Sequence, residues 1–587
     1  MTRAKRIVAW GLFSLAMLVG SGLLLADRLT PPATGEPSTA LPVQVDQTAL
    51  DRELQPILDR HPGRTGVIMV ADGLDAFAAR AMSARQAGRS LDLQYYIWHD
   101  DLTGRLLGRE ALQAAERGVR VRVLLDDVNA GGKDEALLAL DRHPNIEVRL
   151  YNPFRNRAGV RRLLEMAQRL FSLNHRMHNK QWIADGRVAV LGGRNIGAEY
   201  FSASDESNFH DLDLLLFGPA VEQSSAIFDA YWNSDAAVPM ETLEEPDVDP
   251  LAQLLKAIGT EAEGAPARVY LDRVDGSRSV QDYLAQSLAP HWIERIEVVS
   301  DRPLKCLEDG VTGERLVDRI QRDLAMARRK AFVISPYFVP GDTATRNFVA
   351  LAGKQVQVAI VTNSLAANDV VAVHGGYAGY RPTLLAGGVH LYEIRARKGP
   401  GQDSDGDGRA DAPPPAGQVS TDDGRVDGAP RAGGTTGERL AATGAGGEGG
   451  RGGGGGLGSG SGGGDGSSGV GSGAGSSSGA SLHTKAYLVD DRIGFVGSFN
   501  MDPRSATLNT EMGVFFDHPG LAAELNREFL HLAGPRLSYW VWLMDGDLRW
   551  LDRATTPPRL YTREPEADAW QRAQAAVMRW LPIESQL

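Results

Sequence analysis

Short apolar runs alternate with amphipathic segments in two parts of the chain, and the order is the same in both. In the first part, strand-like runs at residues 91–98, 119–125 and 146–150 accompany a segment of helical periodicity at 106–117. The second part repeats this order, with strand-like and helical segments at 331–338, 343–351, 356–362 and 390–394. Alternating strands and helices are typical of layered α/β domains. The repetition predicts a duplicated α/β fold. Each copy would contribute half of a site, and the two halves would face each other across one cleft.

Composition marks the limits of these parts. Residues 28–64 are polar with several prolines and are expected to form a tether. We assign residues 65–240 to a first domain and 241–587 to a second. Glycine and serine dominate residues 398–480. Such a segment cannot bury enough apolar surface to offset the entropy lost on ordering, so we expect a disordered insertion in the second domain.

The N-terminus carries an uncharged apolar segment, residues 7–26. Its length is about that needed to cross a bilayer as a helix. A cleavable signal peptide is the alternative, but the run is long for a signal core and no clear small-x-small site precedes Asp27. We therefore expect residues 1–27 to be an uncleaved membrane anchor. Positive charges before the segment outnumber those after it, which predicts that the rest of the chain lies outside the cytoplasm.

Charge and cysteine content narrow the functional classes. The formal net charge is −12 and the single cysteine is Cys306. Nucleic-acid-binding proteins usually present a strongly basic face, so the acidic balance argues against a nucleic-acid partner. Neither an HExxH motif nor a cysteine cluster indicates a metal. Residues 403–411 partly match a calcium loop, but Pro414 stands where such a loop has a bidentate glutamate. We predict no metal and no cofactor.

One polar pattern occurs twice with identical spacing. It consists of His-x-Lys, four residues, Asp, six residues, and Gly-small-x-Asn. The first motif comprises His178, Lys180, Asp185, Gly192, Gly193 and Asn195, and the second comprises His483, Lys485, Asp490, Gly497, Ser498 and Asn500. Two copies of a multi-position pattern are hard to obtain by chance, so we interpret them as functional rather than as surface decoration.

Strand geometry explains why these residue types belong together. Side chains two apart on a strand point to the same face, so the His and Lys of each motif should project together. A second apolar run follows each Asp, and a hairpin there would bring the Asn amide beside the His and Lys. This cluster of donors suits the oxygens of a phosphate group. Two imidazoles beside lysines suit a reaction that attacks a phosphodiester with a nucleophile and a proton donor.

The paired motifs resemble those of the phospholipase D superfamily, and within it the chain is similar to the bacterial cardiolipin synthases with a single N-terminal hydrophobic segment. The resemblance covers most of residues 65–587 apart from the insertion. Its supporting stretches are residues 94–101, 192–197, 502–505, 509–511 and 581–587. Gly193 departs from the general superfamily pattern, in which serine is common, although this branch often has glycine there. The resemblance implies two tandem phospholipase D-like α/β/α sandwich domains that form a pseudo-dimer with one shared active-site cleft.

The resemblance also implies ping-pong transfer through a phosphatidyl-histidine. One of His178 and His483 attacks the donor phosphorus, and the other protonates the leaving alcohol and then activates the acceptor hydroxyl. A carboxylate should hold the remote nitrogen of each ring, and the candidates are Asp211 in the first half and Glu511 in the second.

The remaining motif residues receive roles from the same resemblance. The groups expected to neutralise the phosphate oxygens are Lys180, Lys485, Asn195, Ser498 and Asn500. Asp185 and Asp490 are counted with the catalytic motif, although we expect them to fix its fold rather than touch substrate.

The leading hypothesis is a cardiolipin synthase at the bacterial inner membrane. It would transfer a phosphatidyl group from phosphatidylglycerol or phosphatidylethanolamine to phosphatidylglycerol. A phospholipase D hydrolase that releases phosphatidic acid is the alternative, because the same residues serve water as the acceptor. The acidic net charge and the N-terminal anchor argue against a nuclease. The presence of a complete motif in both halves argues against a catalytically silent scaffold. The expected partners are membrane phospholipids and the bilayer, with no nucleic acid. The motifs fix neither the donor, nor the oligomeric state, nor which histidine attacks.

Two further segments each have two interpretations. Residues 154–173 combine helical apolar spacing with several arginines, which suits either an anionic lipid surface or ordinary packing on the domain core. Aromatic residues at 539–544, with Trp550, Trp570 and Trp580, suit a lipid interface, although core packing is the more ordinary account for most of them.

Overall fold

The computed structural model describes residues 35–579, apart from 131–132, 155–164, 166–174, 244–263, 285–288, 306–314 and 397–481, together with Gln586. Four of the segments discussed above therefore lie wholly or almost wholly outside the described residues. They are the apolar N-terminal segment, the arginine-rich segment 154–173, the Gly/Ser-rich insertion and the calcium-like loop. No helix among the described residues is both long and apolar enough to cross a bilayer.

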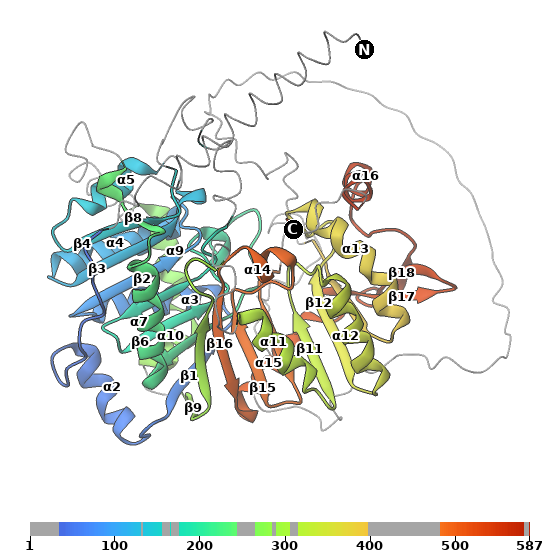
Figure 1. The fold of residues 1–587 in the computed structure, drawn as a ribbon, viewed down its shortest axis with the longest axis horizontal. Coiled ribbons are helices and arrows are strands. Elements are labelled where there is room, and N and C mark those ends of the chain that lie inside the picture. The colour runs from blue at the N-terminus through green and yellow to red at the C-terminus, as the bar shows by residue number, and fades with distance from the viewer. Residues whose placement is uncertain are drawn as a thin grey trace, which may run out of the picture. The chain divides into compact units, whose positions relative to one another are not determined.

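Two large mixed sheets organise the chain (Figure 1). The strands of the first sheet are, in spatial order, β8 (Ala237–Pro239), β4 (Ile146–Tyr151), β3 (Arg120–Asp126), β2 (Ser90–Tyr95), β5 (Gln181–Ala184), β6 (Val188–Gly192), β7 (Asp213–Phe217), β1 (Thr65–Val70) and β9 (His291–Ile293). Those of the second are β10 (Ile296–Ser300), β16 (Met512–Asp517), β15 (Ile493–Gly497), β14 (Ala486–Val489), β11 (Lys330–Ile334), β12 (Gln357–Asn363), β13 (His390–Ile394), β17 (Ser538–Met544), β18 (Asp547–Asp552) and β19 (Arg559–Tyr561). We call the parts built on these sheets the first half and the second half.

The two sheets share one topology. Strands β2, β3 and β4 pair in parallel, and so do β11, β12 and β13. The hairpin β5–β6 continues antiparallel from β2 to β7 and then β1, just as β14–β15 continues from β11 to β16 and then β10. The middle parallel strand of each sheet, β3 or β12, is buried on both faces after its first residue, as expected for strands covered by helices on both sides. The predicted duplication is confirmed.

Helices cover both faces of each sheet. In the first half they are α2 (Ala49–Asp59), α3 (Gly73–Gln86), α4 (Leu102–Glu116), α5 (Asp134–Asp141), α7 (Pro219–Trp232), α9 (Ala265–Asp275) and α10 (Arg278–Leu284). Trp182 on β5 bonds to Ser83 of α3 on one face, whereas Arg122 on β3 pairs with Asp229 of α7 on the other. This arrangement is the α/β/α sandwich that the resemblance implied.

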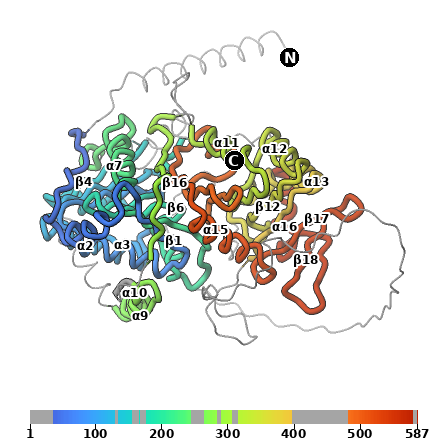
Figure 2. The backbone as a smooth tube through the Cα atoms, turned by 90° about the horizontal axis from the view of Figure 1, so that it is seen from below, coloured from blue at the N-terminus to red at the C-terminus, as the bar shows by residue number. Residues whose placement is uncertain are grey.

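The second half repeats the sandwich. Its helices are α11 (Leu316–Ala325), α12 (Gly341–Gly353), α13 (Val371–Ala386), α14 (Pro503–Thr507), α15 (Pro519–Leu532) and α16 (Ala569–Met578). Tyr487 on β14 donates to Asp323 of α11 on one face, and Phe332 on β11 stacks on Phe529 of α15 on the other. Each half has its own apolar core. The described residues of both halves nevertheless belong to one compact unit, in which β6 and β7 lie beside β15 and β16 (Figure 2).

Local sequence explains where the predicted elements shift. Helix α4 begins at Leu102, ahead of the predicted 106, because the Asp101 side chain caps it by accepting the Gly104 N–H at 2.9 Å. The strand predicted at 331–338 ends at Ile334, just before Ser335 and Pro336, and proline has no N–H to donate to a sheet.

The two sheets change over later than the predicted domain limit at 240. Strand β9 still pairs with β1 of the first sheet, and β10 is the first strand of the second. The limits of the domains stay a prediction, but the sheets themselves change between Ile293 and Ile296. Among the C-terminal aromatics, Tyr539, Trp540 and Trp550 are buried and Trp570 is exposed, while Trp580 lies outside the described residues.

The aspartate of each motif closes a hairpin and ties it to the neighbouring strand. Asp185 and Asp490 both adopt a left-handed backbone, with φ of 54° and 50°. The Asp185 carboxylate accepts the N–H groups that lead into β2, from Gly88, Arg89 and Ser90. The Asp490 carboxylate accepts the equivalent groups leading into β11, from Arg328, Arg329 and Lys330. This geometry supports the expectation that both residues fix the fold of the motif.

We predict that Asp185→Asn and Asp490→Asn each lower the free energy of unfolding by about 1–3 kcal/mol, because asparagine tolerates the left-handed backbone but turns an amide N–H₂ toward backbone donors. Chemical denaturation measures the change. Asp545→Asn is the matched control, since Asp545 has a φ of 54° and is exposed in the β17–β18 turn. Equal stability of all three variants would contradict this account.

Candidate active site

Backbone hydrogen bonds between the halves bring the two motifs together. The His178 N–H donates to the Thr510 carbonyl at 2.9 Å, and the Thr510 N–H donates to the Arg176 carbonyl at 2.9 Å. On the other side, the His483 N–H donates to the His210 carbonyl at 2.8 Å. The segment before each motif histidine is thus bonded to a segment of the opposite half. Both histidines are therefore placed by contacts between the halves.

Each motif histidine forms a hydrogen bond with a carboxylate of the opposite half. His178 Nδ1 lies 2.9 Å from Glu511 Oε2, and His483 Nδ1 lies 2.6 Å from Asp211 Oδ2. The sequence named both carboxylates as orienting groups, and the structure adds that the partners are exchanged between the halves. A carboxylate on Nδ1 fixes the tautomer with the proton there, which leaves a lone pair on Nε2. The two side chains stay 10% and 14% exposed, so a ligand can reach the rings.

Two serines hold Glu511 in place. Ser498 Oγ donates to Glu511 Oε2 at 2.5 Å, and Ser505 Oγ donates to Oε1 at 2.8 Å. Sequence reasoning assigned Ser498 to the phosphate oxygens, but in this structure its hydroxyl is engaged by the carboxylate. Ser505 was missed as part of the site. Its signal was its place in the stretch 502–505, one of those that carried the family resemblance.

Gly193 of the first motif makes room for Asp211. A Cβ atom added at Gly193 would lie 2.2 Å from Asp211 Oδ1 and 2.9 Å from Cγ, far inside van der Waals contact. Aspartate is one methylene shorter than glutamate, so its carboxylate sits closer to its own backbone. The second half has the longer Glu511 and accommodates Ser498 in the position equivalent to Gly193. The departure from the superfamily pattern is therefore matched by the choice of carboxylate.

The two motif lysines are buried and turned back on their own motifs. Lys180 Nζ donates to the His178 carbonyl at 2.5 Å, and Lys485 Nζ donates to the His483 carbonyl. Burial lowers the pKa of Lys485 to about 8, although Asp211 and Glu511 favour its charged form. Burial also holds the pKa of Lys180 well below its usual value, and Lys485 adds to this effect. An anion bound beside them would favour the charged form of both lysines.

Burial also keeps both histidines neutral. It lowers the pKa of His178 to about 4 and that of His483 to about 3, with the nearby lysines adding to the effect and the carboxylates opposing it. The pKa of Asp211 is lowered to about 2, because His483 and Lys485 outweigh the opposite effect of burial. At neutral pH the site therefore holds two neutral imidazoles on two ionised carboxylates.

Aromatic rings frame the histidines. The Tyr96 ring meets the His178 ring edge-on, with centroids 5.0 Å apart, and the Tyr200 ring meets His483 in the same way at 5.1 Å. Lys180 Nζ lies 5.2 Å from the Tyr96 ring centroid. Tyr96 follows β2 in the stretch that carried the family resemblance, whereas Tyr200 had no local signal in the sequence.

The two motif asparagines differ in their surroundings. Asn195 Oδ1 accepts the Ile97 N–H at 3.2 Å and its Nδ2 donates to the Tyr200 hydroxyl at 2.9 Å. The side-chain oxygen of Asn500 is buried without a hydrogen-bond partner among the described residues. This oxygen is a hydrogen-bond acceptor, so it suits a donor group of a ligand such as a hydroxyl rather than a phosphate oxygen. The phosphate-binding roles of both stay predictions.

One cluster in the described part of the chain has donor atoms close enough for a metal ion: His99, Asp101 and Glu199. Its atoms already have protein partners. His99 Nδ1 lies 3.2 Å from Glu199, and Asp101 accepts the N–H groups of Gly104 and Ala198 at 2.9 and 2.7 Å. These bonds account for the cluster as a link between the start of α4 and the turn at Ala198.

Comparisons with known proteins place this site in a family. The family model described as "Cardiolipin synthase, PLD-like domain" matches residues 82–232 and 469–533. Cardiolipin synthase C of Escherichia coli (strain K12) is 34% identical over 534 residues, covering 90% of this chain and 98% of that protein. An uncharacterised protein of Helicobacter pylori is 29% identical over 473 residues, covering 79% of this chain and 78% of its own length. Among solved structures, a phosphatidylserine synthase of Haemophilus influenzae Rd KW20 matches with a TM-score of 0.48 and 13% identity over 84% of this chain and 92% of that one.

Anion binding should be coupled to protonation of the histidines. Sulfate stays doubly charged across the working pH range, and its charge should raise both imidazole pKa values above their values of about 4 and 3 in the empty site. Sulfate therefore gives each imidazole a higher pKa in the complex than in the free protein. At pH values between these two pKa values the complex holds more protons than the free protein, so the affinity for sulfate must rise as pH falls. We expect sulfate to bind up to about tenfold more tightly per pH unit for each proton taken up, between about pH 7 and pH 5. Calorimetry in buffers of different ionisation enthalpy counts these protons.

The double variant His178→Gln, His483→Gln is the control for this measurement, and it should take up fewer protons on binding sulfate, with only the contribution of Lys180 and Lys485 left. A wild-type affinity that is independent of pH, with no proton uptake, would contradict the assignment of two neutral histidines.

Proposed function

The chain belongs to the cardiolipin synthase family of PLD-like proteins and is a phosphatidyltransferase of that type, and we propose that it transfers a phosphatidyl group from phosphatidylglycerol or phosphatidylethanolamine to a hydroxyl of phosphatidylglycerol. The observation that carries this proposal is that each motif histidine bonds a carboxylate of the opposite half. Both imidazoles therefore belong to one site, and each has its Nδ1 on a carboxylate. A transferase that works through a covalent intermediate needs such a pair, because one ring bonds phosphorus while the other moves protons.

In the first half-reaction, Nε2 of one histidine attacks the donor phosphorus. The bond from phosphorus to the headgroup oxygen breaks, and the second imidazole, protonated when the phosphate anion binds, gives its proton to that oxygen. Glycerol or ethanolamine leaves, and the phosphatidyl group stays on the first histidine. The carboxylate on Nδ1 stabilises the positive charge that develops on the attacking ring. Lys180 and Lys485 neutralise the non-bridging oxygens.

In the second half-reaction, the second imidazole, now neutral, takes the proton from a hydroxyl of phosphatidylglycerol. The oxygen attacks the phosphorus and the bond to histidine breaks, so cardiolipin forms and both rings return to their starting states. Water in place of the acceptor lipid would give phosphatidic acid, but the family relationship does not favour that outcome. Phospholipids are therefore both donor and acceptor.

The proposed setting is a membrane, with residues 1–27 as the anchor and the catalytic body on the extracytoplasmic side. This setting follows from the uncharged run at residues 7–26 and from the charges around it. It stays a prediction of the sequence, because the segment lies outside the described residues.

An assay of purified full-length protein in mixed micelles tests the function. We expect cardiolipin from phosphatidylglycerol alone, with release of glycerol, and ethanolamine release when phosphatidylethanolamine is also a donor. Mass spectrometry of lipids and released alcohols separates these outcomes. Phosphatidic acid without cardiolipin would replace the transferase with a hydrolase.

Loss of either histidine should stop turnover. We expect His178→Ala and His483→Ala each to lower the rate by on the order of a thousandfold or more, because one imidazole cannot be both leaving group and proton carrier. The control is His143→Ala, whose ring accepts the Asn145 N–H in the turn before β4 and touches neither motif. Full activity in either motif variant would exclude the two-histidine mechanism.

A further inference from the structure

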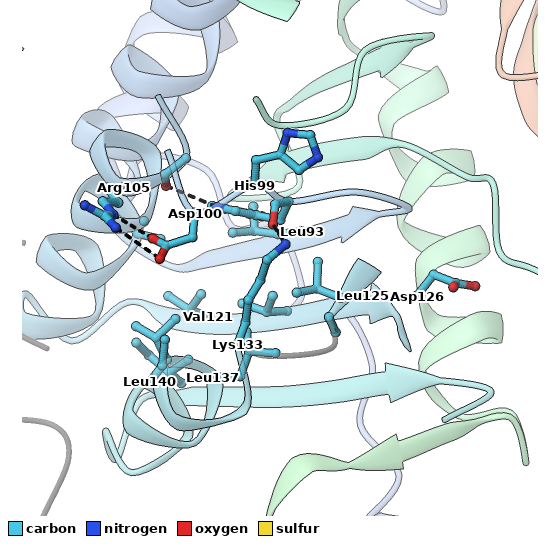
Figure 3. A pocket seen from close by; sticks show the side chains of 18 of the residues that line it. Leu93, His99, Asp100, Arg105, Val121, Leu125, Asp126, Lys133, Leu137 and Leu140 are labelled. Carbon is cyan, nitrogen blue, oxygen red and sulfur yellow. Dashed lines mark hydrogen bonds and ion pairs between the residues drawn. The ribbon is translucent and has the colours of Figure 1, made fainter. Parts of the chain in front are cut away.

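The first half contains an apolar cavity of about 350 Å³, and this volume lies in the range of ligand-binding pockets (Figure 3). Strand β3 forms its floor with Val121, Val123 and Leu125, and helix α5 closes one side with Leu137 and Leu140. Polar groups such as the paired Asp100 and Arg105 line it as well. The pocket is open to solvent on one side and its lining is mostly apolar, which suits an apolar group of a ligand.

The cavity adjoins the active site through two of its lining residues, although no residue of either motif lines it. Tyr96 and Asp126 line it, and both are linked to the first motif. The Tyr96 ring packs edge-on against the His178 ring, and Asp126 Oδ2 accepts the N–H of Met177, the residue before His178, at 2.9 Å. A molecule in the cavity would thus end within one side chain of the catalytic histidine. In Figure 3, Asp126 lies at the C-terminal end of β3, while Leu137 and Leu140 lie toward the other end of the cavity.

Helix α4 keeps the cavity open by presenting small residues to it. Gly104, Gly108 and Ala111 all line the space. Gly104 has a local reason, since a Cβ there would lie 1.9 Å from the His99 carbonyl oxygen. Gly108 has none, because an added Cβ would meet no atom within 4 Å. Glycine inside a helix is unfavourable compared with alanine, so Gly108 maintains the space at a cost to the helix.

We propose that this cavity holds one acyl chain of the phospholipid whose phosphate lies between His178 and His483. The inference rests on the proposed function, because that reaction places a phosphate with attached acyl chains beside Tyr96. An alkyl chain matches the valine, leucine, isoleucine and alanine side chains that make up half of the lining residues. Polar groups among them already have partners, since Lys133 Nζ donates to the Trp98 carbonyl at 2.7 Å and Asp100 pairs with Arg105. The site would select donors or acceptors by the length of that chain.

Gly108→Leu tests the proposal by filling the cavity. Each methylene kept out of an apolar site weakens binding about fourfold, so we expect kcat/KM for long-chain phosphatidylglycerol to fall by on the order of tenfold or more. Activity on dihexanoyl phosphatidylglycerol, whose chains are too short to need the space, should change little. Gly108→Ala adds only a methyl group and should keep wild-type chain preference.

Gly379→Leu is the matched control, because Gly379 is also inside a helix with no atom within 4 Å of an added Cβ but lies exposed on α13. It should leave the preference for chain length unchanged. An equal loss on long and short chains in Gly108→Leu, or an equal shift in Gly379→Leu, would overturn the inference.

Photo-crosslinking separates this inference from the proposed function. Phosphatidylglycerol with a diazirine at the end of one chain should label the α5–β4 region of the wild type, at Leu137, Leu140 or Ile146, and Gly108→Leu should lose this label. Labelling without transfer activity would retain the cavity as a lipid site and refute the function. Transfer activity with labels only elsewhere would refute the acyl-chain site and retain the function.

Discussion

The structure depends on the bond between each motif histidine and the carboxylate of the opposite half. Glu511 and Asp211 are almost completely buried, with 0% and 2% exposure. A buried carboxylate without a partner is strongly destabilising, and neither half alone supplies the imidazole that its own carboxylate bonds. The same constraint explains the backbone bonds of Thr510 and His210 across the boundary, which hold the histidines where the carboxylates can reach them. The two halves therefore make one site, and neither half contains a complete one.

Duplication did not leave the half-sites identical. The first half combines Asp211 with Gly193, and the second combines Glu511 with Ser498, because the shorter carboxylate occupies the space that a serine side chain would need. Asn195 is bonded on both sides of its amide, whereas the oxygen of Asn500 has no partner among the described residues. Two identical half-sites would suit two histidines with the same role in the reaction. The two half-sites thus differ in the carboxylate, in the hydroxyl and in the bonding of the amide, and in the proposed mechanism the two histidines also have different tasks.

Spacing in the sequence predicted much of this site, for a clear physical reason. Residues two apart on a strand share a face, so His-x-Lys could be placed, and a hairpin of fixed length placed the motif aspartates and asparagines. The exchange of Asp211 and Glu511 could not be predicted, since it depends on how two separately folded sheets dock. Tyr200 and the sheet position of β9 were missed for the same reason. The role of Ser498 depends on Glu511, which lies thirteen residues later in the sequence. The length of the Glu511 side chain decides whether its carboxylate reaches the Ser498 hydroxyl.

The central claim is that two histidines from opposite halves divide one reaction, with a covalent bond to one of them. Rapid quenching of the wild-type protein with a short-chain phosphatidylglycerol, followed by peptide mass spectrometry under alkaline conditions, tests it most directly. We expect a phosphatidyl adduct on the peptide that carries either His178 or His483, and on only one of the two. An adduct on a residue outside the two motifs, or transfer at full rate with no adduct at any quench time, would contradict it.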